Sequence, residues 1–292
     1  MFLPSRCILD GVVVANELVD LVKRSKRGCF MFKIDFEKTY DSMNWDILDN
    51  MMNWMSFDDT WRKWVRAVVC SSRMSMLVNG SSITEFQAER GLKKGDPLAP
   101  FLFLMVAKRL HDLVEKAREM GDFKSLKLSS TVEFSMLQYV DDSVIIGEPC
   151  HGNLLAVKAI LRGFELVSAL RFNFPKSSFF GYGEEGFVAR TPDFLHYLLS
   201  SVLFRYLGIL IGISPMRVLT WEPMVSSFRR PLGSWKVQYL SIGGRITLIN
   251  FVLSRAPLYF FSFYKALNAC YRHVGEYSNE VLWSGVLDTY KI

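Results

Sequence analysis

The sequence contains no hydrophobic run long enough to cross a membrane. Its most apolar segment, residues 101–107, continues into charged residues, and a second one, residues 251–264, is interrupted by Arg255 and Pro257. A membrane-spanning helix needs about 20 predominantly apolar residues. The first six residues also lack the basic stretch and apolar run of a secretory signal. We therefore expect an intracellular protein that does not insert into a membrane.

Cysteine pairs are also absent. The five cysteines are scattered, with no spacing that suits a zinc site or a disulfide framework. Unpaired thiols of this kind are typical of a reducing, intracellular compartment. Half of the 292 residues are hydrophobic, which is enough for one large or two modest packed domains.

Acidic residues are scarce in one part of the chain. Between residues 204 and 265, Glu222 is the only acid beside eight basic residues, so this stretch carries a net charge of +7, whereas the whole chain carries +6. Such a concentration favours a polyanionic partner, with nucleic acid first and a membrane second. An ordinary solvated face is the alternative, and charge alone does not decide between them.

The hydrophobic pattern predicts a mixed order of helices and strands. Residues 10–27 predict a helix with a basic last turn, and residues 29–36 predict a buried strand with Asp35 near its end. Ser42 is expected to cap the helix that follows. This order favours an α+β domain with an antiparallel sheet, followed beyond about residue 213 by a mostly helical unit.

Three further segments have clear local signals. Residues 73–86 predict a hairpin that turns at the Asn-Gly pair within it. Pro100 is expected to open a helix that runs to about Met120. Residues 135–147 have two apolar arms around a pair of acids, which predicts a second hairpin with those acids at its tip.

The two acids of that second hairpin, Asp141 and Asp142, are costly side by side because like charges repel and each needs solvation. A bound divalent cation would relieve that cost, and carboxylate oxygens suit Mg²⁺. Asp35 could complete the site if the two strands are neighbours, although it lies 106 residues before Asp141. The alternative is a simple polar turn, which the spacing alone does not exclude.

Six short motifs occur in order along the chain, at residues 32–42, 90–100, 138–142, 173–177, 206–208 and 235–245. The first reads Phe-Lys-Ile-Asp-Phe-Glu-Lys-Thr-Tyr-Asp-Ser, the second begins Arg-Gly-Leu-Lys-Lys-Gly-Asp-Pro, and the third reads Gln-Tyr-Val-Asp-Asp. Together they resemble the motifs of reverse transcriptases from non-LTR (LINE-type) retrotransposons, especially those abundant in plants.

The resemblance implies a right-hand polymerase palm, in which an antiparallel sheet packs on helices. Residues 1–213 would form this palm with partial fingers, and residues 214–292 a mostly helical thumb or connection region. The implied reaction is two-metal transfer of a nucleotide from a deoxynucleoside triphosphate to the 3′-hydroxyl of a DNA primer on an RNA template. The resemblance also implies a nuclear protein, and it leaves the oligomeric state open.

Catalytic roles follow residue by residue from the same resemblance. Asp35 and Asp141 match the metal ligands, Asp142 matches the third carboxylate, and the backbone carbonyl of Phe36 would also face a metal. The metals would be two Mg²⁺ ions, with Mn²⁺ as an alternative. Lys176 matches a lysine proposed to protonate the leaving pyrophosphate.

Binding positions are implied in the same way. Tyr40 matches the aromatic gate beneath the incoming sugar, where a 2′-hydroxyl would clash, and a place in the core is the alternative for it. Contacts to duplex phosphates would be insensitive to sequence and sensitive to salt. The other matched positions are Gly95, Asp96 and Pro97 near the nucleotide and template, Tyr206, Leu207 and Gly208 in the primer grip, and Arg229, Arg230, Lys236 and Arg245 on the duplex.

Several positions depart from the family pattern. Lys94 stands where Gln is usual, which would change the template contact, and Tyr139-Val140 stands where Phe-Ala is usual. The resemblance also implies that most of the fingers, which normally clamp the triphosphate, are missing. Two alternatives are therefore kept: a catalytically inactive, truncated remnant that at most binds nucleic acid, and a group II intron-type maturase, which would carry a basic helical domain.

Overall fold

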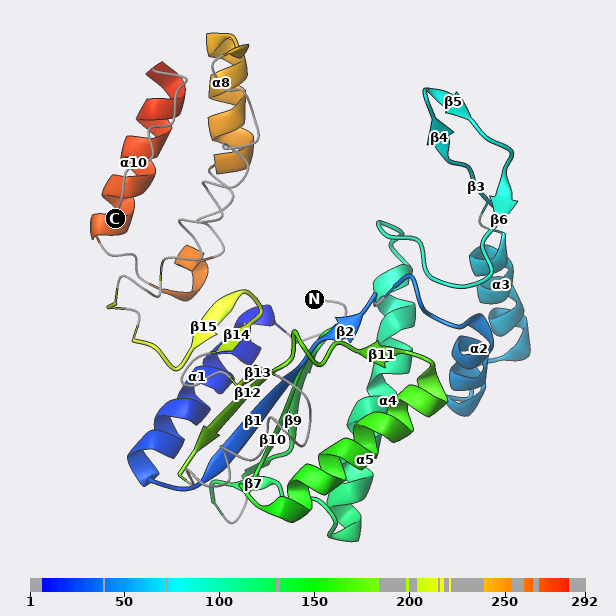
Figure 1. Cartoon of the computed structure of the whole chain (residues 1–292), viewed down its shortest axis with the longest axis vertical. Helices are drawn as coiled ribbons and strands as arrows, with labels where there is room; N and C mark the ends of the chain where they lie inside the picture. The colour runs from blue at the N-terminus through cyan, green and yellow to red at the C-terminus, as the bar shows by residue number, and fades with distance from the viewer. Residues whose placement is uncertain are drawn as a thin grey trace. The chain divides into compact units, whose positions relative to one another are not determined.

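The computed structural model describes residues 7–38, 40–71, 73–129, 132–183, 198–199, 204–214, 216–217, 221, 239–253, 260–264 and 268–283 (Figure 1). The chain divides into two compact units, Met1–Phe204 and Arg205–Ile292, here called the first and the second unit. The predicted domain boundary between residues 213 and 214 stays a prediction. None of the helices in the described ranges combines the length and hydrophobicity needed to cross a bilayer.

A five-stranded sheet forms the centre of the first unit, with the strand order β13-β12-β1-β10-β9. Neighbouring strands are antiparallel, except that β12 and β13 are parallel. The predicted antiparallel sheet is therefore confirmed. The strands are β1 (Cys29–Ile34), β9 (Met136–Tyr139), β10 (Asp142–Gly147), β12 (Ser178–Tyr182) and β13 (Leu198–Leu199).

Helices cover both faces of this sheet. On one face, α4 (Ala99–Met120) and α5 (His151–Ser168) lie side by side and share a hydrophobic cluster with Phe30 and Phe32 of β1 (Figure 1). On the other face, α1 (Ile8–Ser25) contacts β9 and accepts a hydrogen bond from β12, and its buried residues lie outside that cluster. Burial on both faces explains why the sequence of β1 is an almost continuous apolar run.

The ends of α4 and α1 follow from local sequence signals. As predicted, α4 has Pro100 in its first turn and ends at Gly121, which has a left-handed φ of +82°. The helix expected at residues 10–27 lies two residues earlier at both ends, because Lys26 rather than Gly28 takes the left-handed conformation that terminates α1.

The cap of the next helix differs from the prediction. In α2 (Trp45–Trp54), Asn44 Oδ1 accepts hydrogen bonds from two backbone N–H groups of the first turn. Ser42, the expected cap, instead donates its hydroxyl to the carbonyl of Lys38, which also accepts from the Ser42 N–H. The expectation was wrong because Ser42 closes the preceding turn.

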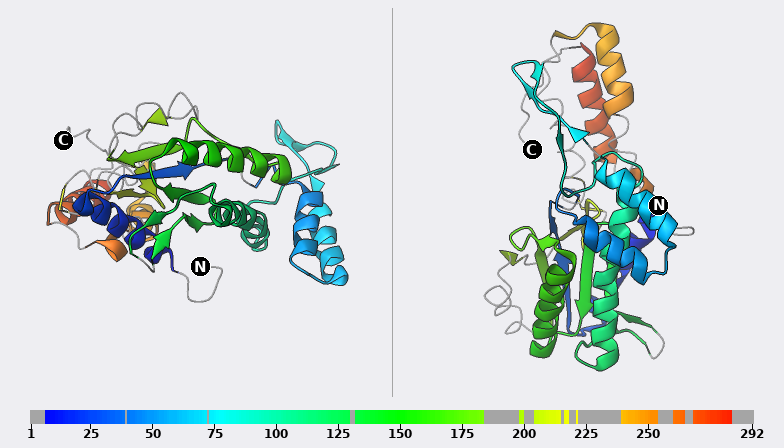
Figure 2. Two further views of the ribbon diagram at one scale, coloured as in Figure 1. Left: turned by 90° about the horizontal axis from the view of Figure 1, so that it is seen from below. Right: turned by 90° about the vertical axis from the view of Figure 1, so that its right-hand side faces the viewer.

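Helix α3 (Asp59–Cys70) leads into a hairpin that we call the arm, residues 73–87. The loop residues Asn79 and Gly80 have φ of +52° and +83°, as a type I′ turn requires, so the predicted hairpin is confirmed. Figures 1 and 2 show the arm extending beyond the end of α3. Its strands are β3 (Arg73–Met74), β4 (Leu77–Val78), β5 (Ser81–Ser82) and β6 (Phe86–Gln87).

Two short strand pairs flank the main sheet. β2 (Phe36–Glu37) continues from β1 and pairs with β11 (Arg171–Phe172). β7 (Leu126–Lys127) pairs with β8 (Glu133–Phe134). Both pairs are antiparallel, and the first extends the sheet at the end where Asp35 lies.

The second unit begins within a hairpin and continues with helices. Strands β14 (Phe204–Tyr206) and β15 (Ile209–Ile211) pair with each other. Its helices include α8 (Ile242–Leu248), the π-helix η3 (Ile249–Leu253) and α10 (Asn268–Trp283), and residues 260–263 are helical as well.

Candidate active site

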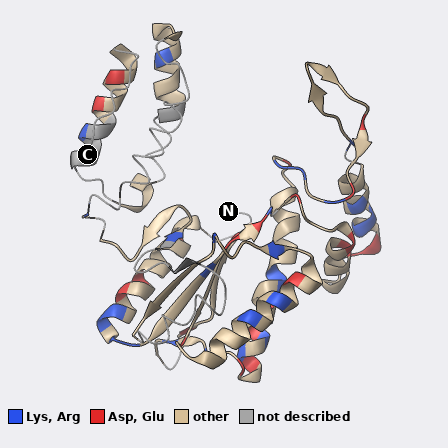
Figure 3. Ribbon diagram, viewed as in Figure 1, with Lys and Arg blue, Asp and Glu red and all other residues tan. Residues whose placement is uncertain are grey.

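Strand pairing brings the predicted carboxylates together. β1 and β10 are antiparallel with Ile34 opposite Ser143, so Asp35, which follows Ile34, lies beside Asp142, which precedes Ser143. Figure 3 shows the acidic residues at this end of β1, where the chain continues into β2. The strand that leads to Asp35 and the strand that begins at Asp142 are therefore neighbours, which is the condition for the three carboxylates to form one site.

The acidic hairpin, residues 136–147, turns one residue earlier than predicted. Tyr139 pairs with Asp142, so only Val140 and Asp141 form the tip and Asp142 is the first residue of β10. Val140 has a φ of +54°, which is strained for a β-branched side chain. Two-residue turns with a positive φ at this position usually have glycine there. The strained turn places Asp141 at the exposed end of the hairpin.

Negative charge is concentrated at this edge of the sheet. The pKa of Asp141 is raised, first because the surrounding protein withdraws its carboxyl from part of the water. The charges of Asp142 and Asp35 raise this pKa further, whereas a backbone hydrogen bond and the positive charge of Lys33 lower it. Lys33 Nζ lies 2.7 Å from Asp142 Oδ1.

The donor chemistry of this edge fits a divalent cation. Carboxylate oxygens are the ligands that Mg²⁺ prefers, and a cation would relieve the mutual repulsion of the three acids. Within the described ranges, however, no three His, Cys, Asp or Glu side chains form a ready coordination cage. Asp142 is instead held in its ion pair with Lys33. The residue types fit a metal, while the arrangement of their side chains is not a coordination shell.

The loop that carries Lys176 is bound to the backbone of Asp35. The Asp35 N–H donates to Ser177 Oγ over 3.2 Å, and the Asp35 carbonyl accepts from the Asn173 N–H over 2.8 Å. Ser177 Oγ in turn donates to the Asn173 carbonyl. Lys176 lies between these two residues and is exposed, so it extends from a loop anchored at the carboxylate end of β1.

Phe36 and Tyr40 pack against one residue of α4. The ring centroid of Phe103 lies 5.6 Å from each of their rings. Burial raises the pKa of Tyr40, and the charge of Asp141 raises it further. Tyr40 therefore lies at the edge of the core and close enough to Asp141 to feel its charge. The metal-facing role of the Phe36 carbonyl stays a prediction.

The loop of the second motif is tied to the turn that contains Tyr40. The N–H groups of Gly91 and Leu92 donate to the carbonyls of Met43 and Tyr40, both over 2.7 Å. Trp45 Nε1 donates to the Gly91 carbonyl over 2.8 Å. Gly91 has a φ of +93°, and a Cβ there would lie 2.9 Å from a backbone oxygen of the turn. This close approach requires glycine.

Gly95, Asp96 and Pro97, which were predicted to lie near the nucleotide, follow the hydrogen-bonded residues Gly91 and Leu92 and precede α4. Asp96 Oδ1 accepts from the backbone N–H two residues later over 2.8 Å, so it supports the start of the helix. Gly95 and Pro97 are exposed, and Gly95 has a φ of +88°. Lys94, at the position where Gln is usual, forms an exposed ion pair with Asp41 over 3.2 Å.

The predicted primer grip is the turn between β14 and β15. Leu207 and Gly208 form the two-residue loop, with φ of +51° and +79°. Tyr206 is buried. The conformation is that of a tight hairpin, and contact with a primer stays a prediction.

Arg245 is partly engaged within the second unit. Its Nε donates to the Leu240 carbonyl over 3.2 Å, and its Nη1 donates over 3.1 Å to the carbonyl of Leu282 in the last turn of α10. Such carbonyls lack partners within their own helix, so Arg245 supports the helix packing. Its predicted phosphate contact is not tested by these bonds. The other predicted duplex-binding residues, Arg229, Arg230 and Lys236, lie outside the described residues.

Comparison with known families decides the assignment. A family model described as "Reverse transcriptase (RNA-dependent DNA polymerase)" matches residues 1–211, which is most of the chain. The chain belongs to the reverse transcriptase family. The matched segment contains Asp35, Asp141 and Asp142 as well as the loop that carries Lys176.

Curated relatives place this reverse transcriptase near those of non-LTR retrotransposons. It is 24% identical over 259 residues to the transposon TX1 uncharacterized 149 kDa protein of Xenopus laevis. It is 24% identical over 222 residues to the Pol polyprotein of the R2 retrotransposable element of Popillia japonica. The alignments cover 85% and 70% of this chain but only 19% and 30% of the two relatives.

A solved structure supports the fold. The telomerase from Candida albicans, in complex with the TWJ fragment of telomeric RNA, superimposes with a TM-score of 0.51 over 97% of this chain and 48% of the telomerase. At 13% sequence identity the match concerns the fold alone. It confirms the predicted fold class, an antiparallel sheet packed on helices.

For three residues near the carboxylates, the sequence of this reverse transcriptase predicted no individual role. Asn173 and Ser177 hold the backbone of Asp35, and Lys33 holds the side chain of Asp142. A signal existed for Lys33, because it is the single charge in the strand Cys-Phe-Met-Phe-Lys-Ile. Asn173 and Ser177 are the first and last residues of the motif at residues 173–177, but their bonds to Asp35 join positions far apart in the chain, so the sequence does not reveal them.

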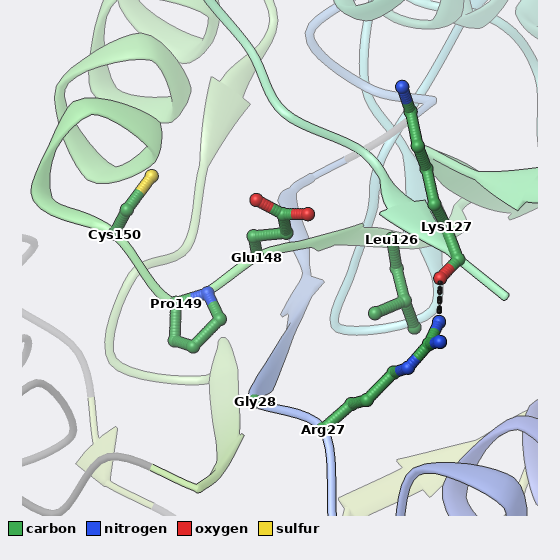
Figure 4. A pocket seen from close by; sticks show the side chains of 7 residues that line it. All are labelled: Arg27, Gly28, Leu126, Lys127, Glu148, Pro149 and Cys150. Carbon is green, nitrogen blue, oxygen red and sulfur yellow. Dashed lines mark hydrogen bonds between the residues drawn. The ribbon is translucent and has the colours of Figure 1, made fainter. Parts of the chain in front are cut away.

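A separate cavity lies at the opposite end of β1 (Figure 4). Its volume is about 480 Å³. Because β1 is six residues long and rises about 3.3 Å per residue, the cavity lies about 20 Å from the carboxylates. We assign it no part in the reaction. Its lining residues are Arg27, Gly28, Leu126, Lys127, Glu148, Pro149 and Cys150.

Proposed function

We propose that this chain is the RNA-directed DNA polymerase core of a LINE-type retrotransposon of the kind abundant in plants, acting in the nucleus. It would transfer a nucleotide from a deoxynucleoside triphosphate to a primer 3′-hydroxyl on an RNA template. The supporting observation is that a member of the reverse transcriptase family brings Asp35 and the acidic hairpin to one sheet edge. Because the chain spans less than a third of the relatives named above, the activity of the whole protein belongs to this proposal.

The carboxylates would hold the metal ions of the reaction. Asp35 and Asp141, with the carbonyl of Phe36, are the proposed ligands, and Asp142 is the third carboxylate. Two bound Mg²⁺ ions, or Mn²⁺ in their place, would activate the primer hydroxyl and neutralise the leaving pyrophosphate. The pKa of Asp141, raised by partial desolvation of its carboxyl and by its acidic neighbours, is the electrostatic feature that a cation would offset.

Other residues of the edge would position the nucleotide. Tyr40 would lie beneath the sugar and exclude a 2′-hydroxyl, because its ring is fixed against Phe103. Lys176, on the loop bound to Asp35, would give a proton to the leaving pyrophosphate. The loop of Gly95, Asp96 and Pro97 would contact the nucleotide and template, since it is tied to the Tyr40 turn.

Contacts with the duplex would come from the second unit. Tyr206, Leu207 and Gly208 would form the primer grip. Arg and Lys side chains of the basic stretch would contact backbone phosphates, which makes binding weaken as salt is added. The proposed residues are Arg229, Arg230, Lys236 and Arg245.

Primer extension tests the proposal. The chain is incubated with poly(rA)/oligo(dT), dTTP and Mg²⁺, beside Asp141→Asn and the matched control Asp20→Asn, an exposed carboxylate of α1. We expect extension by the native chain and the control, and a loss of at least about 100-fold in Asp141→Asn, because electrostatic groups at the reacting centre contribute that much. Extension by Asp141→Asn at the native rate would refute the assignment of that residue.

The inactive remnant is the alternative outcome. It predicts no extension by the native chain, together with duplex binding that weakens with salt. A filter-binding titration on the same duplex at two salt concentrations distinguishes this result from a chain that binds no nucleic acid.

A further inference from the structure

Lys33 is the one charged residue of β1, and its side chain is largely withdrawn from water. Only 16% of it is exposed, and its Nζ lies 2.7 Å from Asp142 Oδ1, on a side chain that is 25% exposed. A withdrawn ammonium group is costly unless it is paired. The position of Lys33 is therefore stable only beside a carboxylate.

The register explains why that partner is Asp142. Lys33 lies opposite Val144 in the β1–β10 pair, and Asp142 is two residues before Val144, on the same face. Diagonal neighbours on one face are within reach of a long side chain. The ion pair thus crosses from β1 to β10 at the end of the sheet where the acids converge.

The charge of Lys33 also reaches the tip of the acidic hairpin. The negative charges of Asp142 and Asp35 raise the pKa of Asp141, and the positive charge of Lys33 lowers it. A divalent cation at these carboxylates would have the same sign as Lys33 and would need the same carboxylate. Lys33 and the cation therefore compete for Asp142 and repel each other.

We propose that Lys33 is a positioning residue that serves as an internal counter-ion of the carboxylate edge. In the absence of metal it neutralises Asp142 and holds that side chain against β1. A divalent cation must displace or share this carboxylate, so Lys33 raises the cation concentration that the site requires. The inference rests on the proposed metal-dependent function, because it assigns the same carboxylates to the cation.

Cation binding measured without catalysis tests the inference. Free Mn²⁺ is titrated with the full chain and counted by electron paramagnetic resonance, and thermal unfolding is recorded in EDTA. In Lys33→Met we expect the Mn²⁺ dissociation constant to fall about fivefold or more, because a unit positive charge is removed from the edge. We also expect a lower unfolding temperature without metal, because three acids lose their counter-ion.

Two variants separate this role from simple packing. Lys116→Met removes an exposed lysine of α4 and should leave Mn²⁺ affinity unchanged, and Lys33→Arg should keep it near native because the charge remains. In an Asp142→Asn background, Lys33→Met should lose most of its effect, because the two residues act as a pair. If Lys33→Met does not fold, Lys33→Gln is measured in its place.

The outcomes distinguish this inference from the proposed polymerase. A folded Lys33→Met or Lys33→Gln variant that binds Mn²⁺ no more tightly than the native chain overturns the inference, and so does the absence of Mn²⁺ binding in both proteins. Tighter binding by the variant, in a chain that extends no primer, supports the counter-ion and contradicts the polymerase.

Discussion

Two hairpins of the first unit, the acidic hairpin and the arm, are both closed by two-residue turns, yet their surroundings differ. Val144, Ile145 and Ile146 of the acidic hairpin are at most 1% exposed, whereas Met76 and Leu77 of the arm are 58% and 76% exposed. The acidic hairpin is held between helices, and the arm is held by bonds within itself and with the end of α3. A turn signal therefore predicts that a hairpin forms, but burial decides how firmly it is fixed.

This difference bears on the proposed reaction. Carboxylates that share metal ions must keep their relative positions, which a hairpin packed in a core provides. The arm has no such constraint, because its bonds are local: Ser75 to Ser82, Arg73 to Glu85 and Gln87 to the carbonyl of Cys70. Its apolar side chains contribute little to the stability of the first unit.

The largest expected effect compares one phenylalanine from each region. Phe103 is fully buried and touches Phe36 and Tyr40, so Phe103→Ala should lower the free energy of unfolding by about 3–5 kcal/mol. Phe86→Ala in the arm, where the ring is 45% exposed, should change it by about 0.5 kcal/mol or less. Urea denaturation followed by circular dichroism measures both values. Equal losses would show that the arm is packed as firmly as the core.

An intermediate effect compares two glycines with positive φ. Gly91→Ala should cost about 3 kcal/mol, because the strained backbone is combined with a Cβ contact of 2.9 Å. Gly80→Ala in the arm should cost only about 1 kcal/mol, since it has the same kind of φ and nothing within 4 Å. Thermal unfolding of the two variants gives the comparison. Similar costs would mean that the close packing of Gly91 against the turn that contains Tyr40 does not contribute to stability.

The smallest effect concerns the acidic hairpin, where the ionised form of Asp141 is unfavourable in the folded chain. A raised pKa means that folding disfavours the ionised Asp141, so the penalty is present at pH 7 and disappears as pH falls through the pKa values of the folded and unfolded chains. In EDTA, Asp141→Asn should therefore unfold at a slightly higher temperature than the native chain at pH 7. Near pH 3 the two should agree. A lower unfolding temperature of the variant at pH 7 would contradict the assigned charge repulsion.

Local features of the fold could be predicted from the sequence. The helix between Pro100 and Gly121 and the turn at Asn79 and Gly80 depend on backbone preferences of single residues, which operate wherever those residues occur. The buried strand that ends at Asp35 is visible as an apolar run. The motif order was enough to identify the family, as the family match confirms.

What could not be predicted depends on contacts between distant segments. The pairing of Ile34 with Ser143 and the bond from Asp35 to Ser177 join residues more than a hundred positions apart. The turn at Val140 and Asp141 was misplaced by one residue, because burial of β10 sets the register and local turn preference does not. Most of the basic stretch lies outside the described residues, and its contact with nucleic acid stays a prediction.

The backbone conformation of Val140 affects how this reverse transcriptase family member would respond to directed evolution. Its left-handed backbone costs about 1–3 kcal/mol, and glycine would adopt it freely. In a screen for heat resistance this relief competes with the lost packing of the Val140 side chain on the core, and glycine also frees the neighbouring Asp141 to change direction. If the chain is the proposed polymerase, a screen for DNA synthesis should reject Val140→Gly, because the position of Asp141 would no longer be fixed.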